Sequence, residues 1–412
     1  MLNISKLYCG LAGESDDLRY SSANSSGPVV VYNCTSRCNL KCLHCYSSSR
    51  VKTLGDELTT NQAKRLLCQL AQVNCPVVLF SGGEALLRDD LFELLTEAKQ
   101  IGLRTVLSTN GTLINPGTAD RLAQCGVSYV GISIDGDEKF HDKFRASSGC
   151  FKAAIAGIEN CKKAGIKTGI RCTITKANAD QIPIIFDIAA SLNTKRICFY
   201  HLIRTGRAKQ LDDQILNVEQ TRNAIDIIIE KTDDFARRAL VDEVLTVGNH
   251  ADGPYILLKL AEETLNSKRG SKMQKKASGV SLKTVNYEKA RQLLLANGGN
   301  RTGEKIGCVS WDGSVHPDQF WFNYSLGSVK DKTFRQIWED SSEPVLNKLR
   351  NKSKFADKRC LACRWFDLCK GNFRFLGNKT DDQYWLNEPA CYLADEETIE
   401  TGNKSFERTR SI

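Results

Sequence analysis

Three closely spaced cysteines, Cys38, Cys42 and Cys45, are the residues whose types and spacing most directly predict chemistry. Thiolates are soft ligands suited to iron–sulfur clusters, and three of them can hold only three irons of a four-iron cluster. The fourth iron is then left open for a small molecule. A structural zinc site is the alternative, since His44 could supply the fourth ligand that tetrahedral zinc requires.

A second group of cysteines follows much later in the chain, at Cys360, Cys363, Cys369 and Cys391. Four thiolates can ligate a four-iron cluster completely, which favours an electron-transfer or structural role. Zinc is the alternative here too, because the spacing of the first three cysteines is also typical of zinc sites.

The composition is that of a globular chain in a reducing compartment. The 412 residues are 41% hydrophobic and predict two or three domains. The 17 cysteines include ligand-like groups rather than an even disulfide framework, so we expect a cytoplasmic protein. No apolar run of about 18 residues predicts a membrane span, and no basic stripe with interleaved aromatic residues predicts nucleic-acid binding. The formal charge of +9 fits either a solvated basic surface or an anionic ligand.

Short apolar runs alternate with longer amphipathic stretches, which predicts a parallel sheet wrapped by helices. The predicted strands are 29–34, 76–80, 104–108, 129–135, 168–175 and 196–201. The predicted helices are 60–73, 89–101, 117–125, 151–164, 180–192 and 218–240. The fold class is therefore α/β, a partial (β/α)6 barrel. Ligands bind at strand ends in such a barrel, and the cysteine loop directly follows the first strand.

The same pattern divides the chain into five parts. We expect an N-terminal segment (1–27), a barrel core (28–240), a helical connector (241–305), a small cysteine-rich domain (306–393) and a charged tail (394–412). The connector is predicted because the strand and helix alternation breaks there and a basic run covers 267–276.

Polar and glycine-rich motifs follow the later predicted strands, at the same rim as the cysteine loop. The run Ser81-Gly82-Gly83-Glu84 joins two glycines, which allow close backbone approach, to a carboxylate that can receive an ammonium group. Ser108 and Asn110 offer hydroxyl and amide groups, either as caps or as ligand contacts. Ser133 ends the fourth strand, and Arg145 can hold a carboxylate in its planar fork or form a surface ion pair.

Together these motifs resemble the radical S-adenosylmethionine superfamily, whose signature is this cysteine spacing with an aromatic-type residue, here His44, before the last cysteine. The resemblance implies that Cys38, Cys42 and Cys45 hold a [4Fe-4S] cluster whose open iron chelates S-adenosylmethionine. One electron from the cluster then splits that molecule into methionine and a 5′-deoxyadenosyl radical.

The resemblance also assigns the remaining rim residues to S-adenosylmethionine. Gly82, Gly83 and Glu84 are expected at its amino group, Ser133 at its ribose and Arg145 at its methionine carboxylate. His44, Ser108 and Asn110 complete the predicted cofactor-binding set.

The second cysteine group resembles the outer auxiliary cluster of the SPASM domain, which occurs in radical enzymes that modify peptides and cofactors. A full SPASM domain holds two auxiliary clusters. Here Asp318 and Phe373 stand where further cysteines are expected, and only Cys308 is left of that set. We therefore expect one auxiliary [4Fe-4S] cluster, two clusters in all, with Cys308 either a buried thiol or a group on the substrate side.

Sequence segments outside the cysteine motifs narrow the resemblance to one group within the superfamily. Segments 4–10, 243–253, 307–313 and 316–321 resemble the AhbC/NirJ group of radical enzymes in alternative heme synthesis. This resemblance covers nearly the whole chain. It implies removal of two acetate side chains from 12,18-didecarboxysiroheme to give iron-coproporphyrin III, with an electron donor such as ferredoxin or flavodoxin.

An iron-tetrapyrrole substrate gives a role to four more residues. Arg204 and Arg207 follow the sixth predicted strand and can pair with substrate carboxylates. His201 and His250 can act as axial ligands of the substrate iron or as ordinary hydrogen-bonded structural residues.

Three other functions stay open at this level. The related NirJ-type reaction removes propionate side chains from the same substrate. Maturation of a ribosomal peptide would require an N-terminal recognition domain, for which residues 1–27 are too few. A non-enzymatic heme chaperone on the same fold would not need four further thiolates.

Overall fold

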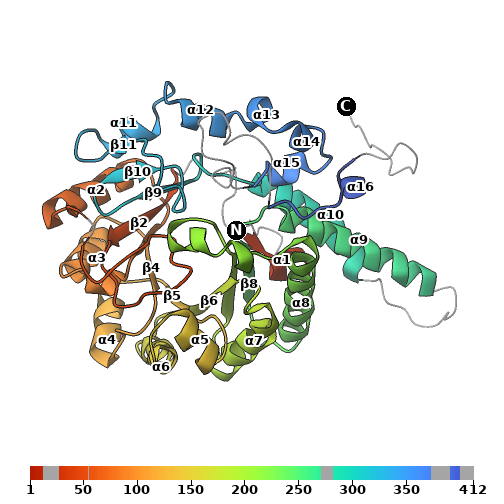
Figure 1. The fold of residues 1–412 in the computed structure, drawn as a ribbon, viewed down its shortest axis with the longest axis horizontal. Helices are drawn as coiled ribbons and strands as arrows, with labels where there is room; N and C mark the ends of the chain where they lie inside the picture. Colours follow the sequence, from red (N-terminus) through yellow and green to blue (C-terminus); the bar gives the residue numbers. More distant parts are fainter. Residues whose placement is uncertain (13–26, 54, 271–281, 373–389, 400–412) are drawn as a thin grey trace.

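Eleven strands form one open sheet within the part of the chain that the structure describes. This computed structural model describes residues 1–12, 27–53, 55–270, 282–372 and 390–399. The strand order is β1-β8-β7-β6-β5-β4-β3-β2-β9-β10-β11 (Figure 1). The strands are β1 (Leu2–Asn3), β2 (Val29–Thr35), β3 (Val78–Gly82), β4 (Thr105–Thr109), β5 (Val130–Ser133), β6 (Thr168–Ile174), β7 (Arg196–His201), β8 (Glu243–Val247), β9 (Ile306–Val309), β10 (Ser314–His316) and β11 (Gly327–Ser328).

Strands β2 to β8 pair in parallel and in chain order, as expected of a partial (β/α) barrel. β2 to β7 confirm the six predicted strands, with bounds that differ by at most two residues. β8 lies within 241–305, where the sequence predicts a connector, so the parallel sheet extends one strand beyond the prediction. The sheet does not close into a barrel, since β8 next pairs with β1 and β2 with β9.

Helices follow the parallel strands and lie along the outer side of the sheet (Figure 1). They are α2 (Thr60–Gln72), α3 (Leu91–Gln100), α4 (Pro116–Gln124), α5 (Glu138–Phe144), α6 (Cys150–Lys163), α7 (Ile182–Ser191) and α8 (Val218–Arg237). Thr59 caps α2, where its hydroxyl accepts a hydrogen bond from the Gln62 N–H. Tyr32 and Phe80 meet edge to face in the core, with ring centroids 5.7 Å apart. Of these helices only α5 is missing from the prediction, and it ends directly before Arg145.

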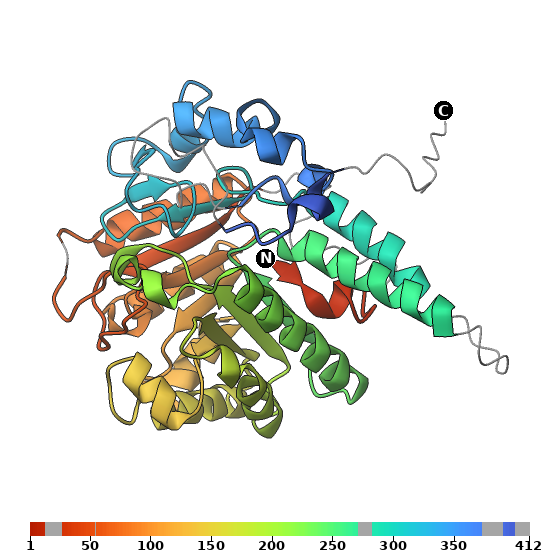
Figure 2. The same cartoon turned by 45° about the vertical axis from the view of Figure 1, so that its right-hand side comes forward.

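Two long helices, α9 (Asp252–Gly270) and α10 (Leu282–Asn297), run side by side and project away from the sheet (Figure 2). The short helix α1 (Ile4–Leu7) packs between α10, α8 and β8. Its Ser5 hydroxyl accepts a hydrogen bond from the Val244 N–H, so the first residues of the chain are fastened to the last parallel strand. No helix in the described ranges is long and apolar enough to span a membrane.

The C-terminal part of the chain continues the sheet and then lies over its end (Figures 1 and 2). After β9 to β11 it contains α11 (Phe334–Trp338), α12 (Pro344–Arg350), α13 (Lys352–Phe355), α14 (Lys358–Leu361), α15 (Phe366–Cys369) and α16 (Asp395–Thr398). β9 pairs in parallel with β2, the strand that leads into the cysteine loop. At the start of the predicted tail, Glu397 on α16 forms an ion pair with Arg222 on α8, 2.5 Å apart.

Two of the three SPASM cysteine positions, Asp318, where the cysteine is replaced, and Cys308, where it is kept, are buried. The Asp318 carboxylate accepts hydrogen bonds from Thr302 Oγ1 (3.0 Å) and the Phe320 N–H (2.8 Å). Burial raises the pKa of Asp318 to about 6. The Cys308 thiol is a buried group that accepts a hydrogen bond from Asn33 Nδ2 at 3.3 Å. The third such position, Phe373, lies outside the described residues.

The buried Asp318 carboxyl predicts a pH-dependent stability. Its pKa is higher in the folded chain than in the unfolded chain, so the folded state loses stability as the pH rises from about 4 to 6. A rise from 3.8 to about 6 corresponds to roughly 3 kcal/mol once the group is fully ionised. In Asp318→Asn, the amide can keep both hydrogen bonds without the charge. The Tm of Asp318→Asn relative to wild type should therefore be higher at pH 7.5 than at pH 5.

The matched control is Asp234→Asn, which removes an exposed carboxylate that pairs with Arg238 at i,i+4. Its Tm difference from wild type should be nearly the same at both pH values. If the Tm difference between Asp318→Asn and wild type does not grow with pH, the assignment of a protonated carboxyl at low pH is contradicted.

Candidate active site

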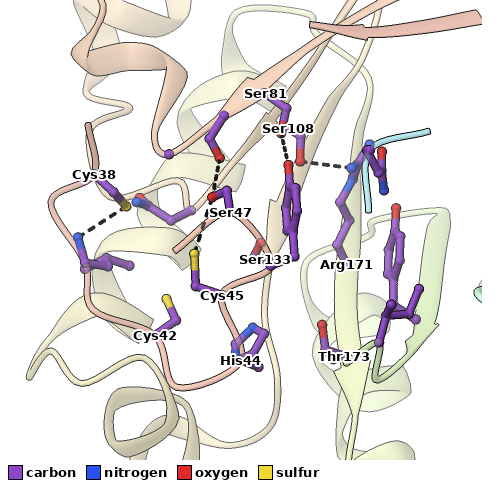
Figure 3. A pocket seen from close by; sticks show the side chains of 18 of the residues that line it. Cys38, Cys42, His44, Cys45, Ser47, Ser81, Ser108, Ser133, Arg171 and Thr173 are labelled. Carbon is purple, nitrogen blue, oxygen red and sulfur yellow. Dashed lines mark hydrogen bonds between the residues drawn. The ribbon is translucent and has the colours of Figure 1, made fainter. Parts of the chain in front are cut away.

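One cavity at the carboxyl ends of the parallel strands brings together most of the predicted site residues (Figure 3). It is open to solvent and has a volume of about 1060 Å³. The predicted residues that line it are Cys38, Cys42, His44, Cys45, Gly82, Gly83, Ser108, Asn110, Ser133, Arg145, His201 and Arg207. Glu84, Arg204 and His250 are not among its lining residues.

The cysteine loop is held by backbone contacts from the segment after β7. Arg207 donates from Nε to the Cys42 carbonyl (2.8 Å) and from its N–H to the Cys45 carbonyl (2.9 Å). Gly206 has a φ of +59°, and a Cβ there would lie 2.4 Å from the Cys45 carbonyl oxygen. Only glycine allows this approach, so the Gly206-Arg207 pair fixes the course of the loop. Arg207, predicted to contact substrate, thus lines the cavity mainly as a support of the loop.

Hydrogen-bond donors point at the thiol sulfurs. The Leu40 N–H donates to Cys38 Sγ (3.4 Å), Arg145 Nη1 lies 3.8 Å from Cys42 Sγ, and the Ser47 hydroxyl lies 3.4 Å from Cys45 Sγ. Burial raises the pKa of Cys38 to about 12 and also raises the pKa of Cys42. Ligation by iron would therefore release protons from these thiols, and the surrounding donors would stabilise the resulting thiolates.

The three thiols fit an iron–sulfur cluster, because they form a soft donor set that faces one cavity with N–H and O–H donors behind it. Among the described residues, no three Cys, His, Asp or Glu side chains are placed to hold a single metal ion.

Arg145 is engaged by a buried carboxylate. Its Nε and Nη2 each lie 2.8 Å from Asp135 Oδ2, and Asp135 Oδ1 accepts the Thr173 N–H at 2.9 Å. Burial raises the pKa of Asp135, but the Arg145 charge outweighs this and holds the pKa below its usual value. The fork of Arg145 therefore faces Asp135, where the sequence suggests a grip on the methionine carboxylate. The remaining guanidinium nitrogen, Nη1, faces the Cys42 sulfur.

The Gly82-Gly83-Glu84 motif packs against the end of β2. A Cβ on Gly82 would lie 2.4 Å from the Thr35 carbonyl oxygen, and one on Gly83 2.0 Å from that of Arg37. Glu84 is fully buried, and its carboxylate accepts hydrogen bonds from Thr109 Oγ1 (2.7 Å) and the Asn110 N–H (2.8 Å). Glu84 thus ties β3 to the end of β4, and the two glycines face the cavity.

His44 stacks on Phe144, with ring centroids 4.2 Å apart and an angle of 9° between the planes. Burial lowers the pKa of His44 to about 4, so the ring is neutral at pH 7. A neutral, flat ring at the cavity wall can face an aromatic ligand without the desolvation penalty of a charge.

The four later cysteines share a second cavity, of about 930 Å³. Its lining includes Cys360 and Cys363 near α14, Cys369 at the end of α15, and Cys391. The Gly371 N–H donates to Cys369 Sγ at 3.4 Å, and burial raises the pKa of Cys369. The structure therefore brings together the complete predicted set of four soft ligands, which fits an iron–sulfur cluster with no open position.

The predicted substrate residues separate into two groups. His201 lines the main cavity at the end of β7. Arg204 is 47% exposed and pairs with Asp212 at 2.6 Å, away from the cavity. His250 is buried, its backbone N–H donates to Asn372 Oδ1 at 2.5 Å, and burial lowers the pKa of its ring well below the usual value. The sequence assigned Arg204 because it follows the sixth predicted strand and His250 because neutral imidazole binds iron, but neither residue lines the main cavity.

A row of hydrogen bonds connects the two cavities. His201 Nε2 lies 3.0 Å from Asp252 Oδ2, and the Tyr392 hydroxyl donates to Asp252 Oδ1 at 2.7 Å. Asp252 is fully buried, and Tyr392 directly follows Cys391 in the chain. A side chain of the main cavity is thus linked through one carboxylate to the cysteine-rich site.

Sequence reasoning missed several residues of the main cavity, among them Tyr46, Arg171, Tyr200 and Phe320. The Tyr46 hydroxyl donates to Asn33 Oδ1 (2.9 Å), and its ring meets Phe320 at 5.6 Å. Arg171 and Tyr200 lie on the inner faces of β6 and β7, and strand alternation could have identified them. Phe320 comes from the C-terminal part of the chain, and no local pattern places it here.

Two family models match the chain. One is described as the radical SAM superfamily and matches residues 32–187. The other is SPASM, described as an iron–sulfur cluster-binding domain, and matches residues 302–364.

The chain is also similar to whole proteins. The Fe-coproporphyrin III synthase of Methanosarcina barkeri is 43% identical over 412 residues, which cover 96% of this chain and 98% of that protein. The pre-heme d1 synthase of Dinoroseobacter shibae is 36% identical over 372 residues, which cover 90% of this chain and 87% of that protein. Among solved structures, Streptococcus suis SuiB bound to its precursor peptide SuiA matches with a TM-score of 0.67 at 18% identity, over 90% of this chain and 76% of SuiB. This last likeness shows the fold alone.

The chain belongs to the radical SAM superfamily and carries a SPASM iron–sulfur domain. Within the superfamily it is of the AhbC/NirJ type, as the sequence predicts. A [4Fe-4S] cluster and S-adenosylmethionine are therefore its cofactors, together with further iron–sulfur ligation in the SPASM domain.

The buried pair of Asp135 and Arg145 predicts a large loss of stability on truncation. Asp135→Ala leaves the Arg145 charge buried without a partner, which should lower the free energy of unfolding by about 3–5 kcal/mol. The double variant Asp135→Ala/Arg145→Met removes both charges and should recover much of this loss. Thermal denaturation followed by circular dichroism measures both effects.

The control is Asp233→Ala, since Asp233 pairs with Arg237 on the exposed side of α8. Its Tm should change little, because exposed pairs contribute about 0–1 kcal/mol. A double variant no more stable than Asp135→Ala would show that the charge of Arg145 is not what destabilises the single variant.

Proposed function

We propose that this chain is a radical SAM enzyme of heme biosynthesis that removes two acetate side chains from 12,18-didecarboxysiroheme to give iron-coproporphyrin III. The observation that carries the proposal is the 43% identity to a Fe-coproporphyrin III synthase over almost the full length of both chains. The cavity supports it, since cluster-type cysteines, aromatic rings and arginines line one solvent-open space.

In this proposal Cys38, Cys42 and Cys45 hold the radical-generating cluster. When bound there, the cluster supplies the electron that cleaves S-adenosylmethionine to methionine and a 5′-deoxyadenosyl radical. The backbone at Gly82 and Gly83 receives the amino end of that molecule, and Ser133, at the end of β5 in the same cavity wall, receives the ribose. His44 offers its flat neutral ring to the adenine side. Glu84, Ser108 and Asn110 keep these strand ends in register, through contacts that include the Glu84 to Asn110 bond.

His201 is the residue we propose as axial ligand of the substrate iron, in preference to His250. Histidines that bind metals usually give their other ring N–H to a carboxylate, which fixes the tautomer and raises the basicity of the free nitrogen. His201 has this arrangement, because Nε2 faces Asp252 at 3.0 Å and leaves Nδ1 for a ligand. His250 is buried outside the main cavity.

Cys360, Cys363, Cys369 and Cys391 hold the auxiliary cluster in this proposal. Full thiolate ligation suits electron transfer, and the Asp252 hydrogen bonds connect this site to the main cavity. The auxiliary cluster would accept or deliver an electron during product formation. A protein such as ferredoxin or flavodoxin would supply the reducing electrons.

A second candidate is the removal of propionate side chains on the route to a d-type heme. The observation that favours it is the 36% identity to a pre-heme d1 synthase over 87% of that protein. The same residues would hold the same cofactors, and only the placement of the substrate side chains would differ.

Product analysis distinguishes these reactions. Anaerobic incubation of the holoenzyme with 12,18-didecarboxysiroheme, S-adenosylmethionine and dithionite should yield 5′-deoxyadenosine and iron-coproporphyrin III, as measured by mass spectrometry. The control Cys38→Ala/Cys42→Ala/Cys45→Ala should form neither product, because no ligands are left for the cluster. A product with both acetates intact and propionates lost would show the second candidate instead. Absence of 5′-deoxyadenosine in the wild type would favour a chaperone.

The assignment of His201 predicts an optical change. Ferric iron-coproporphyrin III bound to His201→Gln should lose the spectral signature of imidazole ligation that it shows with the wild-type chain, because glutamine offers no comparable nitrogen. His250→Gln should leave that signature in place. A spectrum altered by the His250 substitution and not by the His201 substitution would move the axial ligand to His250.

A further inference from the structure

Arg171 lies in the wall of the main cavity without a carboxylate partner. It extends from β6 on the side of the cavity away from the cysteine loop, and its Nη1 donates to the Ser108 hydroxyl at 2.9 Å (Figure 3). No acidic side chain in the described ranges lies within 4.0 Å of its guanidinium nitrogens. Its Nε is buried and has no hydrogen-bond partner among the described residues. The positive charge is therefore met by the neutral hydroxyls of Ser108 and Tyr129 and by the Tyr200 ring, whose centroid is 6.0 Å away.

The other arginines of this cavity are already engaged. Arg145 has both nitrogens of one edge on Asp135. Arg207 donates to the backbone carbonyls of Cys42 and Ser49. Arg171 is thus the arginine in the described lining whose charge is not met by a carboxylate or by backbone carbonyls. A partly buried cation of this kind is stabilised when an anion binds beside it.

Two glycines make room for Arg171 and for Tyr129, which hydrogen-bonds to it. A Cβ on Gly131 of β5 would lie 2.1 Å from Arg171 Nε, and a Cβ on Gly169 of β6 would lie 2.1 Å from the Tyr129 hydroxyl. Glycine in a strand weakens the strand, and here it allows a side chain to lie flat across the sheet. Arg171 is therefore seated in a space that any larger residue at position 131 would fill.

The position of Arg171 separates it from the cysteine loop. That loop follows β2, and β3, β4 and β5 stand between β2 and β6 in the sheet. At about 4.8 Å per strand, this is roughly 19 Å along the sheet. In the proposed function, S-adenosylmethionine binds beside the cysteines through its amino and carboxylate groups. Its carboxylate would therefore lie on the side of the cavity opposite Arg171. Ser133, expected at the ribose, is the register partner of Arg171, so the ribose and not the methionine carboxylate is expected on this side of the cavity. We therefore expect an anion at Arg171 to come from the second molecule in the cavity.

We propose that Arg171 binds a carboxylate side chain of the tetrapyrrole substrate and so sets the orientation of the ring in the cavity. This inference rests on the proposed function and adds a specificity-determining residue to it. The outer guanidinium nitrogens of Arg171 can meet a carboxylate in a charge-assisted pair. The Tyr200 ring beside the guanidinium offers an aromatic surface for the macrocycle.

The test compares two probes that differ only in their carboxylates. Iron-coproporphyrin III and its tetramethyl ester are titrated into the holoenzyme, and binding is followed by the optical spectrum of the iron-tetrapyrrole. The wild-type chain should prefer the free acid. Arg171→Met should weaken binding of the acid by about 10- to 100-fold, as expected for a lost charge-assisted hydrogen bond, and should leave binding of the ester within about 3-fold. Arg171→Lys should give an intermediate preference.

Two further variants separate this role from a general loss of structure. Gly131→Ala keeps the charge but places a methyl group where Nε lies, so it should reduce the preference for the acid in the same direction. Arg196→Met is the matched control. Arg196, like Arg171, lies over an aromatic ring, that of Tyr129 at 4.6 Å, but it pairs with Glu243 and does not line the cavity. It should keep the wild-type preference.

A parallel arm identifies the source of the carboxylate. Equilibrium dialysis of S-adenosylmethionine against wild-type and Arg171→Met holoenzyme should give the same affinity. If Arg171→Met loses S-adenosylmethionine and keeps its preference for the free acid, the carboxylate is that of methionine and the proposal is overturned. If neither tetrapyrrole preference nor S-adenosylmethionine affinity changes in Arg171→Met, the proposal is also overturned, and Arg171 is left as a structural partner of Ser108 and Tyr129.

Failure of the proposed function would look different. In that case the wild-type chain itself would bind neither tetrapyrrole, and the Arg171 assignment would fall with it. A wild-type chain that binds both probes, with no effect of the Arg171 variants, would reject the Arg171 assignment and leave the proposed function standing.

Discussion

The parallel pairing of β2 to β8 is the constraint on which the rest of the structure depends. Parallel strands joined by outer helices place all their carboxyl ends at one edge of the sheet. That register brings the cysteine loop after β2, the Gly82-Gly83 turn after β3 and His201 at the end of β7 to one cavity. The pairing of β9 with β2 then fixes the SPASM domain relative to the same edge.

The three arginines that line the cavity differ in the groups that they contact. Asp135 neutralises Arg145, and the Arg207 guanidinium donates hydrogen bonds to carbonyls of the cysteine loop. Neither arginine therefore offers a full planar edge to a ligand. Arg171 meets two hydroxyls and an aromatic ring. Because unmatched charge in a partly enclosed space favours an anion, this difference separates arginines that build the site from one that can recognise a substrate.

The two cysteine groups are physically coupled. Asp252 begins α9 and contacts both His201 of the main cavity and Tyr392, the residue after Cys391. A single buried carboxylate thus sets the orientation of a cavity histidine from the SPASM side. Phe320, also from that domain, packs on Tyr46 beside the cysteine loop, so the domain completes the wall of the cavity.

The sequence by itself determined the six strands β2 to β7, their order along the chain and the two sets of cysteines, because these features rest on local periodicity and short spacings. It did not reveal β8 or the open sheet, because strand pairing over long separations leaves no local pattern. Only the tertiary structure decided which charged residues were available. Arg145 and Glu84 lie in recognisable motifs, but their partners, Asp135 and the end of β4, are chosen by the fold. Whether a side chain faces a ligand or a neighbour depends on contacts between distant segments, and spacing along the chain cannot supply them.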